Sequence, residues 1–144
     1  MVASGSAGLT GTRVLLVEDD ADARGWVERI LRDEQAVVVA AASGAEGLLA
    51  LDKERPDVIV SDIGMRGMDG YSFLTEVRRR EDARGAAWVP AIALTAYDDT
   101  AHITRAGQVG FQEHLAKPVD AERLLRAVAE AAGRSLPRGR HPSR

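Results

Sequence analysis

Five short runs of β-branched and other apolar residues recur along the chain, and amphipathic stretches separate them. The runs are residues 13–17, 36–41, 57–61, 90–95 and 111–116. Each run has the length and the residue types of a β-strand. A strand with one face in water alternates apolar and polar residues, whereas these runs are almost continuously apolar. The pattern therefore predicts a parallel sheet that is covered by helices on both faces.

The stretches between the runs carry the spacing of amphipathic helices. Apolar residues in the first stretch recur at intervals of three and four and are predicted to share one buried helix face: Ala23, Trp26, Val27, Ile30 and Leu31. Ser43 and Glu46 form a capping box that begins a second helix. A third helix is expected after Asp69 and a fifth after Asp120. The stretch 98–108 gives the weakest helical signal, because it contains poor helix formers and few apolar positions.

Strict alternation of strands and helices predicts an α/β fold. Five such units suit a flavodoxin-like (βα)5 fold, a doubly wound five-stranded parallel sheet with strand order 2-1-3-4-5. In such sheets the ligand site lies beyond the carboxyl ends of the strands, at the point where the strand order reverses. For this order that point falls between the first and third strands, so the residues that end the strands are the candidates for function.

Composition narrows the choice of function. The chain has 144 residues, of which 45% are hydrophobic and 28% charged, with a net charge of −3 and no cysteine. Interspersed charges leave no basic face for nucleic acid and no polybasic segment for a membrane surface. Disulfides and thiolate metal sites are excluded. No apolar run approaches the ~20 residues of a membrane span, and the first residues lack the pattern of a secretory signal, so the cytoplasm is the expected location.

The two ends of the chain differ from its middle. Residues 1–11 are rich in glycine, serine, alanine and threonine, and residues 134–144 mix proline, glycine and arginine with almost nothing apolar. Such segments do not bury enough apolar surface to fold. We therefore expect flexible segments at 1–11 and 134–144 and a single domain at 12–133. The last segment is too short and polar to form a further domain.

Carboxylates stand at the ends of the first and third apolar runs. Glu18, Asp19 and Asp20 follow the first run, and Asp62 follows the third. A lone carboxylate behind a buried strand costs several kcal/mol of desolvation, so Asp62 is expected to have partners. Carboxylates that gather at one site either raise their pKa values or bind a cation. Oxygen ligands without histidine or cysteine favour a hard ion, and Mg²⁺ is the expected one.

A hydroxyl and an ammonium group follow the remaining strands. Thr95 ends the fourth run, and Lys117 follows the fifth. Taken alone, each is a strand-end hydroxyl or a solvated charge. Together with Asp62, they suit phosphoryl chemistry, because they neutralise phosphoryl oxygens while a carboxylate acts as the nucleophile. Asp20 and Asp69 are assigned a simpler role, since an aspartate directly before a helix caps its open backbone N–H groups.

Four segments carry a resemblance to a known family. They are "VLLVEDD" (14–20), "VIVSDIGMRGMDG" (58–70), "ALTA" (93–96) and "HLAKPV" (114–119). In order and spacing, they resemble the signature segments of response-regulator receiver domains, and the resemblance covers about residues 12–133. The "HLAKPV" segment is more similar to receivers attached to hybrid sensor histidine kinases than to those with DNA-binding outputs.

The resemblance implies a phosphoacceptor in a two-component system. Asp62 would take a phosphoryl group from the phosphohistidine of a histidine kinase or histidine phosphotransfer protein. Glu18 and Asp19 would hold Mg²⁺, together with Asp62 and the backbone carbonyl of Gly64. A domain of this kind is a signalling switch that catalyses its own phosphorylation and dephosphorylation, so it is not expected to be an enzyme with a separate substrate.

The same resemblance implies which residues contact the phosphoryl group and which face of the domain responds to it. Thr95 would hydrogen-bond the phosphoryl group, and Lys117 would pair with it ahead of a cis peptide bond to Pro118, which proline makes less costly. The face formed by the fourth helix, the fifth strand and the fifth helix would respond to phosphorylation and form a weak dimer. No direct contact with nucleic acid or a membrane is expected.

The chain departs from the family pattern at several positions. Arg66 stands where the family usually has proline, which adds a charge and removes rigidity near the site. His114 stands where an aromatic switch residue is common, and a histidine, with an ordinary pKa near ~6.5, would make the switch depend on pH unless the side chain is merely exposed. Gly64 and Tyr97 stand at positions that tune the lifetime of the phosphoryl group. Shielding by Tyr97 predicts a long lifetime, and a solvent-facing Tyr97 does not.

Three other classes stay open. A phosphatase of the haloacid-dehalogenase type also forms an aspartyl-phosphate with Mg²⁺. Asp-x-Asp after the strand is typical of that class, whereas Ile63 and Gly64 follow Asp62 in this chain. A flavin or nucleotide module would need a phosphate-binding loop after the first strand, where "EDDAD" repels phosphate. A receiver-like scaffold that is never phosphorylated typically lacks acidic-pair or acceptor residues that are present in this chain.

Overall fold

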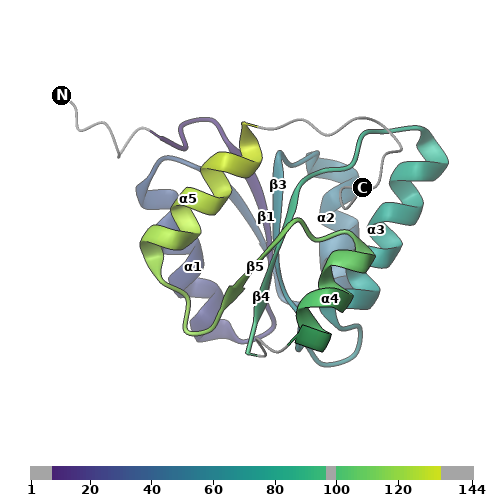
Figure 1. Cartoon of the computed structure of the whole chain (residues 1–144). Helices are drawn as coiled ribbons and strands as arrows, with labels where there is room; N and C mark the ends of the chain where they lie inside the picture. Colours follow the sequence, from purple (N-terminus) through teal and green to yellow (C-terminus); the bar gives the residue numbers. More distant parts are fainter. Residues whose placement is uncertain (1–7, 97–99, 134–144) are drawn as a thin grey trace.

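The computed structural model describes residues 8–96 and 100–133, which form five strands and five helices in strict alternation (Figure 1). The strands are β1 (Arg13–Val17), β2 (Val37–Ala41), β3 (Val58–Asp62), β4 (Ala91–Thr95) and β5 (Glu113–Ala116). The helices are α1 (Ala21–Asp33), α2 (Gly44–Glu54), α3 (Gly70–Arg84), α4 (Thr100–Val109) and α5 (Ala121–Ala132). The predicted strands and helices are confirmed, with bounds that shift by a residue or two.

The strands form one parallel sheet in the order β2-β1-β3-β4-β5, which confirms the predicted flavodoxin-like topology. Helices α1 and α5 cover one face of the sheet, and α2, α3 and α4 cover the other (Figure 1). Strands β3 and β4 are buried at every position. Their continuous apolar runs follow from this, because both faces of each strand contact helices.

Alternate residues of the central strands supply two separate cores. Val14 and Leu16 of β1 pack in the core beneath α1 and α5, which also contains Leu124. Leu15 of β1 packs in the core beneath α2, α3 and α4, which also contains Phe73. The two cores arise because successive side chains of a strand point to opposite faces.

Side-chain caps begin α1, α2, α3 and α5, and the caps at Asp20, Ser43 and Asp69 were predicted. Asp20, Asp69 and Asp120 each accept a hydrogen bond from the backbone N–H three residues later, at 2.8, 2.8 and 3.3 Å. Ser43 accepts one from the backbone N–H of Glu46 at 3.1 Å. The Glu46 carboxylate in turn accepts from the residue before Ser43, at 2.8 Å, one residue earlier than in a standard capping box.

The packed domain begins before residue 12, which corrects the expected boundary of the flexible segment 1–11. Leu9 is 2% exposed and belongs to the core beneath α1 and α5. Its carbonyl accepts from the backbone N–H of Thr12 at 2.9 Å, in a turn that contains Gly11 at φ +79°. A single leucine in a glycine-rich segment gives no periodic signal, so its burial was not predicted. Residues 1–7 and 134–144 lie outside the described residues.

Trp26 does not share the buried face of α1 with Val27 and Leu31, contrary to the prediction. It is 47% exposed, whereas Val27 and Leu31 are buried. Helical spacing identifies an apolar stripe, but it does not show how far the neighbouring elements extend beneath that stripe. Trp26 lies at the stripe's edge. Within the described ranges, no helix has both the length and the apolar character needed to cross a membrane.

Candidate functional site

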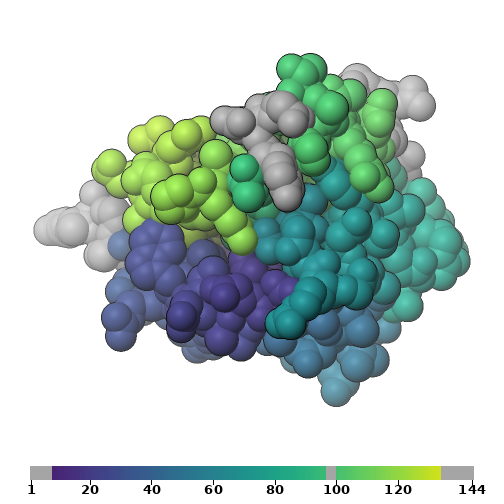
Figure 2. Space-filling model, turned by 90° about the horizontal axis from the view of Figure 1, so that it is seen from below, coloured from purple at the N-terminus to yellow at the C-terminus, as the bar shows by residue number. Residues whose placement is uncertain are grey.

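The carboxyl ends of the parallel strands meet at one end of the molecule, where the strand order reverses between β1 and β3. Figure 2 looks onto this end, and the segments that follow β1, β3 and β5 come together on it. Asp62 is the last residue of β3 rather than the first residue after it, and Thr95 is the last residue of β4. Both are 4% exposed.

Three carboxylates converge at this end. Glu18, Asp19 and Asp62 each offer an oxygen atom, and these oxygens lie within 4.8 Å of one another. Glu18 is 1% exposed and Asp62 is nearly as deeply buried, while Asp19 is half-buried. Three anionic groups at this separation repel one another in a poorly solvated site. The cluster is therefore an acidic pocket whose donor atoms suit a hard divalent cation.

Lys117 connects the two buried carboxylates of the pocket. Its Nζ donates a hydrogen bond to Glu18 Oε1 at 2.9 Å and lies 2.9 Å from Asp62 Oδ1. The residues come from three different strand ends, and 99 positions separate Glu18 from Lys117 in the sequence. The ammonium group offsets part of the carboxylate charge, which lowers the cost of burying both acids.

Burial and hydrogen bonding shift the pKa values of Glu18 and Lys117. Burial raises the pKa of Glu18 above its ordinary value, although hydrogen bonds from Lys117 and from the Asp20 backbone oppose the shift. Burial by itself would lower the pKa of Lys117, but its hydrogen bonds to Asp62 and Glu18, together with their charges, raise it instead. Lys117 therefore stays a cation at neutral pH.

Backbone contacts orient the acidic pair. The backbone N–H of Asp20 donates to Glu18 Oε2 at 3.1 Å, and the Arg24 guanidinium donates to the Glu18 carbonyl at 2.9 Å. The backbone N–H of Arg66 donates to Asp19 Oδ2 at 2.9 Å. The Arg66 side chain is 94% exposed, and its Nε lies 3.7 Å from the same oxygen. Its charge is therefore largely screened by water, and the main contact of Arg66 with the pocket is through its backbone.

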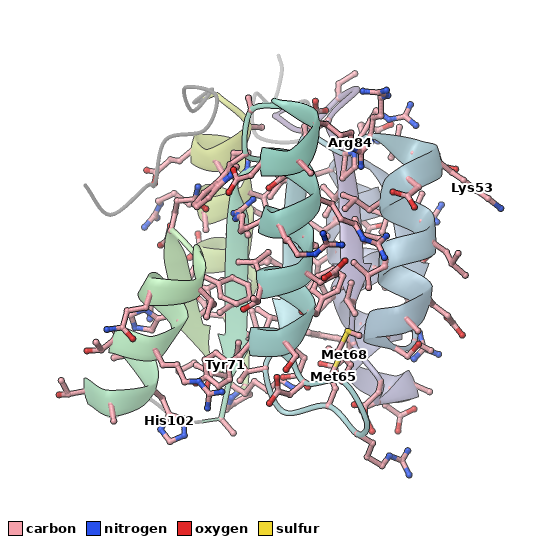
Figure 3. The ribbon with its side chains drawn as sticks, turned by 90° about the vertical axis from the view of Figure 1, so that its right-hand side faces the viewer. Lys53, Met65, Met68, Tyr71, Arg84 and His102 are labelled. Atoms are coloured by element: carbon pink, nitrogen blue, oxygen red, sulfur yellow. The ribbon has the colours of Figure 1, made fainter. Side chains whose placement is uncertain are left out.

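The loop between β3 and α3 is held against the end of β3. The backbone N–H of Gly70 donates to the Ile63 carbonyl at 2.8 Å. A Cβ at Gly70 would lie 2.3 Å from the backbone oxygen of Asp62, so the close approach requires glycine. Met65 is buried in the core beneath α2 and α3, and Met68 packs against it (Figure 3). The loop is thus anchored without the proline that the family usually has at Arg66.

The other residues predicted for the site differ in how much the structure shows of them. Gly64 lies exposed in the β3–α3 loop, with open space where a side chain would be. The Lys117–Pro118 peptide bond is cis, as predicted, and the Lys117 backbone N–H donates to the Thr95 carbonyl at 2.9 Å. His114 is half-buried on β5. Tyr97 lies outside the described residues, so its predicted shielding role stays a prediction.

A cavity of about 420 Å³ beside the pocket was not predicted. It lies between α1 and the segment after β5, and Glu18 and Lys117 reach it from the pocket. Trp26 and Val27 of α1 line it, as does Pro118. The half-exposed Trp26 and the apolar cavity together form a surface next to the carboxylates. Sequence periodicity gave no signal for this surface, because it depends on how far α1 stands from the β5–α5 connection.

The model of the response regulator receiver domain family matches residues 14–129. The chain belongs to this family. The receiver domain is 40% identical over 117 residues to a 14.6 kDa protein in the sodA1 3′ region of Leptolyngbya boryana, covering 81% of this chain and 87% of that protein. It is 36% identical over 124 residues to the transcriptional regulatory protein GlrR of Escherichia coli (strain K12), covering 86% of this chain and 27% of GlrR. The match thus spans about a quarter of GlrR.

Solved structures agree with the family assignment. The receiver domain is similar to the chemotaxis protein CheY4 of Vibrio cholerae, with a TM-score of 0.78, 31% identity, and coverage of 85% of this chain and 99% of CheY4. The predicted membership of the receiver family is therefore confirmed. The expected association with hybrid sensor kinases stays a prediction.

Proposed function

We propose that the receiver domain accepts a phosphoryl group on Asp62 in a Mg²⁺-dependent reaction and works as a switch rather than as an enzyme with a separate substrate. The observation that carries the proposal is the environment of Asp62. Its carboxylate is buried at the end of β3, within 4.8 Å of oxygens from Glu18 and Asp19 and 2.9 Å from the Lys117 ammonium. A purely structural role would not require three carboxylates and an ammonium group at one end of the sheet.

The donor set fits a magnesium ion. Glu18, Asp19 and Asp62 would hold it, because Mg²⁺ prefers carboxylate oxygens and usually keeps several waters. The Gly64 carbonyl is a fourth proposed ligand, in keeping with the exposed position of Gly64 two residues after Asp62. Bound Mg²⁺ would neutralise negative charge that develops on the phosphoryl oxygens.

The chain's own groups supply the rest of the chemistry. An Asp62 oxygen attacks phosphorus, the new O–P bond forms, and the P–N bond of a phosphohistidine donor breaks, leaving the electron pair on the imidazole nitrogen. Lys117 already contacts Asp62 and keeps its positive charge, so it can pair with the phosphoryl group after transfer. Thr95 is the last residue of the neighbouring strand β4, and its hydroxyl would hydrogen-bond that group.

A histidine kinase or histidine phosphotransfer protein is the proposed donor. The donor's histidine has to reach Asp62 from the open end of the sheet, so the partner covers the surface around that opening. The exposed Trp26 and the apolar cavity beside it support this, because they offer an apolar contact next to the site.

Phosphorylation by acetyl phosphate or phosphoramidate tests the proposal. Intact-protein mass spectrometry should detect the addition of one phosphoryl group when Mg²⁺ is present, and none after chelation. Asp62→Asn should abolish the addition, and Asp19→Ala should slow it severely. Asp33→Asn, the same chemical change at the exposed end of α1, is the matched control and should behave as the parent. Normal phosphorylation of Asp62→Asn would show that the acceptor is wrong.

A further inference from the structure

Helix α4 is held less firmly by apolar packing than the other helices that cover the same face of the sheet. Among residues 100–109, all of them described, Ala106 is the one that is buried, whereas α3 buries seven of its residues. Burial of an apolar face supplies most of the stability of a helix in a protein. The position of α4 therefore depends strongly on the individual contacts that it makes with its neighbours.

One such contact joins α4 to the beginning of α3. The Arg105 guanidinium carbon lies 4.0 Å from the centre of the Tyr71 ring. The Tyr71 hydroxyl donates to the His102 carbonyl at 3.5 Å, and Figure 3 shows Tyr71 on the side of α3 that faces His102. Tyr71 is 5% exposed, whereas Arg105 is exposed. The contact is thus a buried ring that carries an exposed cation, and the cation is free to leave the ring at little cost.

A second contact fixes the opposite end of α4. Arg78 of α3 is buried, and its guanidinium donates to the Gly110 carbonyl at 2.7 Å and to Glu81 at 2.8 Å. Gly110 has φ +112°, and a Cβ there would lie 2.7 Å from Arg78 Nε. Because a buried charge-assisted bond is costly to break, this end of α4 is anchored.

Tyr71 also lies next to the acceptor strand. It directly follows Gly70, which lies so close to the end of β3 that a Cβ there would meet the Asp62 carbonyl oxygen, and whose N–H donates to the Ile63 carbonyl at 2.8 Å. A displacement of the end of β3 can therefore reach the backbone of α3 beside Tyr71 through this direct contact, and not only along the β3–α3 loop.

We infer that Tyr71 is a positioning residue that couples the end of β3 to α4: Arg105 on the Tyr71 ring holds α4 in place, and α4 pivots about the Gly110 anchor when this contact is lost. The displacement of β3 that this inference requires rests on the proposed phosphorylation of Asp62. The contact itself can be tested without it.

The first test measures amide hydrogen exchange in the full chain without ligand. Arg105→Met keeps the apolar stem of the side chain and removes the charge, and it should speed exchange in residues 100–109 by about two- to fivefold, the range expected for an exposed cation–π contact. Tyr71→Leu should do the same, and Tyr71→Phe, which keeps the ring, should change exchange little. Arg79→Met removes an exposed cation of α3 that pairs with Glu76 instead, and it is the matched control. Equal exchange in the Arg105→Met and Arg79→Met variants would overturn the inference.

The second test adds Mg²⁺ and beryllofluoride, a mimic of the phosphoryl group. In the parent protein, ligand should protect residues 63–69 and change exchange in α4. In Tyr71→Leu the protection at 63–69 should persist, while the change in α4 should fall at least twofold. An undiminished change in α4 would refute the coupling. No response at 63–69 in the parent would instead refute the proposed function, and the ligand-free test would then decide on the Tyr71 contact by itself.

Discussion

Replacement of Gly70 by alanine is expected to destabilise the domain and to disturb the acceptor site together. Gly70 is the first residue of α3, and its backbone N–H donates to the Ile63 carbonyl, directly after β3, at 2.8 Å. An alanine Cβ would lie 2.3 Å from the Asp62 backbone oxygen and 2.7 Å from the Ile63 Cα. Both are backbone atoms of a buried strand end, so no flexible side chain can move aside.

The size of the effect follows from this geometry. Comfortable contacts between non-bonded heavy atoms lie near ~3.5 Å, so β3 and α3 have to separate by about 1 Å. Overpacking of a well-packed site costs about 1–3 kcal/mol. The first helical position recovers little of the alanine preference, because its N–H has no intrahelical partner in any case. We expect a net loss of about 2 kcal/mol, or roughly 8 °C in Tm for a domain of this size.

Urea unfolding, followed by circular dichroism, measures this loss, and Gly25→Ala is the matched control. Gly25 lies in the exposed interior of α1, with nothing within 4 Å of a built Cβ. There the same change should stabilise the domain by about 1 kcal/mol. A displacement of about 1 Å at Asp62 should also slow phosphorylation, by as much as about 10²-fold. If Gly70→Ala is as stable as the parent, or if both variants shift stability in the same direction, the reasoning from close approach is wrong.

Three further outcomes are expected. Arg78→Met should cost about 3–5 kcal/mol at neutral pH, because it leaves Glu81 buried without its cation. Burial already raises the pKa of Glu81, and the Arg78 charge opposes that shift. As the pH falls through this raised pKa, Glu81 becomes protonated and no longer needs the cation. The stability deficit of the variant relative to the parent should therefore shrink at acidic pH. Urea titrations between neutral and acidic pH measure this deficit, and a deficit independent of pH contradicts it. Lys117→Met should lower the Tm in the absence of metal, because two buried carboxylates then lack their ammonium partner. Added Mg²⁺ should raise the Tm of this variant more than it raises the Tm of the parent, and an equal rise in thermal melts would argue against a cation site. Arg66→Ala keeps the backbone bond to Asp19 and removes an exposed cation, so Mg²⁺ affinity in a tryptophan-fluorescence titration should rise by no more than about fivefold, and a loss of affinity would show that the side chain supports the site.

The local features of the fold could be predicted because their causes lie within a few residues of one another. The Asp20 and Asp69 caps each depend on a backbone N–H three positions away. Likewise, the apolar runs predicted the strands because burial on both faces leaves little room for polar residues. Even the acidic pocket, with Glu18 and Lys117 separated by 99 positions, followed from a general rule, since parallel strands bring their carboxyl ends to one edge of a sheet.

Only the tertiary structure decided which side chains touch once those elements had packed. The burial of Leu9, the exposure of Trp26 and the bridge from Lys117 to both buried carboxylates depend on where neighbouring elements end. Residue spacing within one helix carries no information about that distance. For the same reason, the Arg105 contact with the Tyr71 ring left no pattern in the sequence, because it joins two helices whose separation is set by packing across the whole sheet.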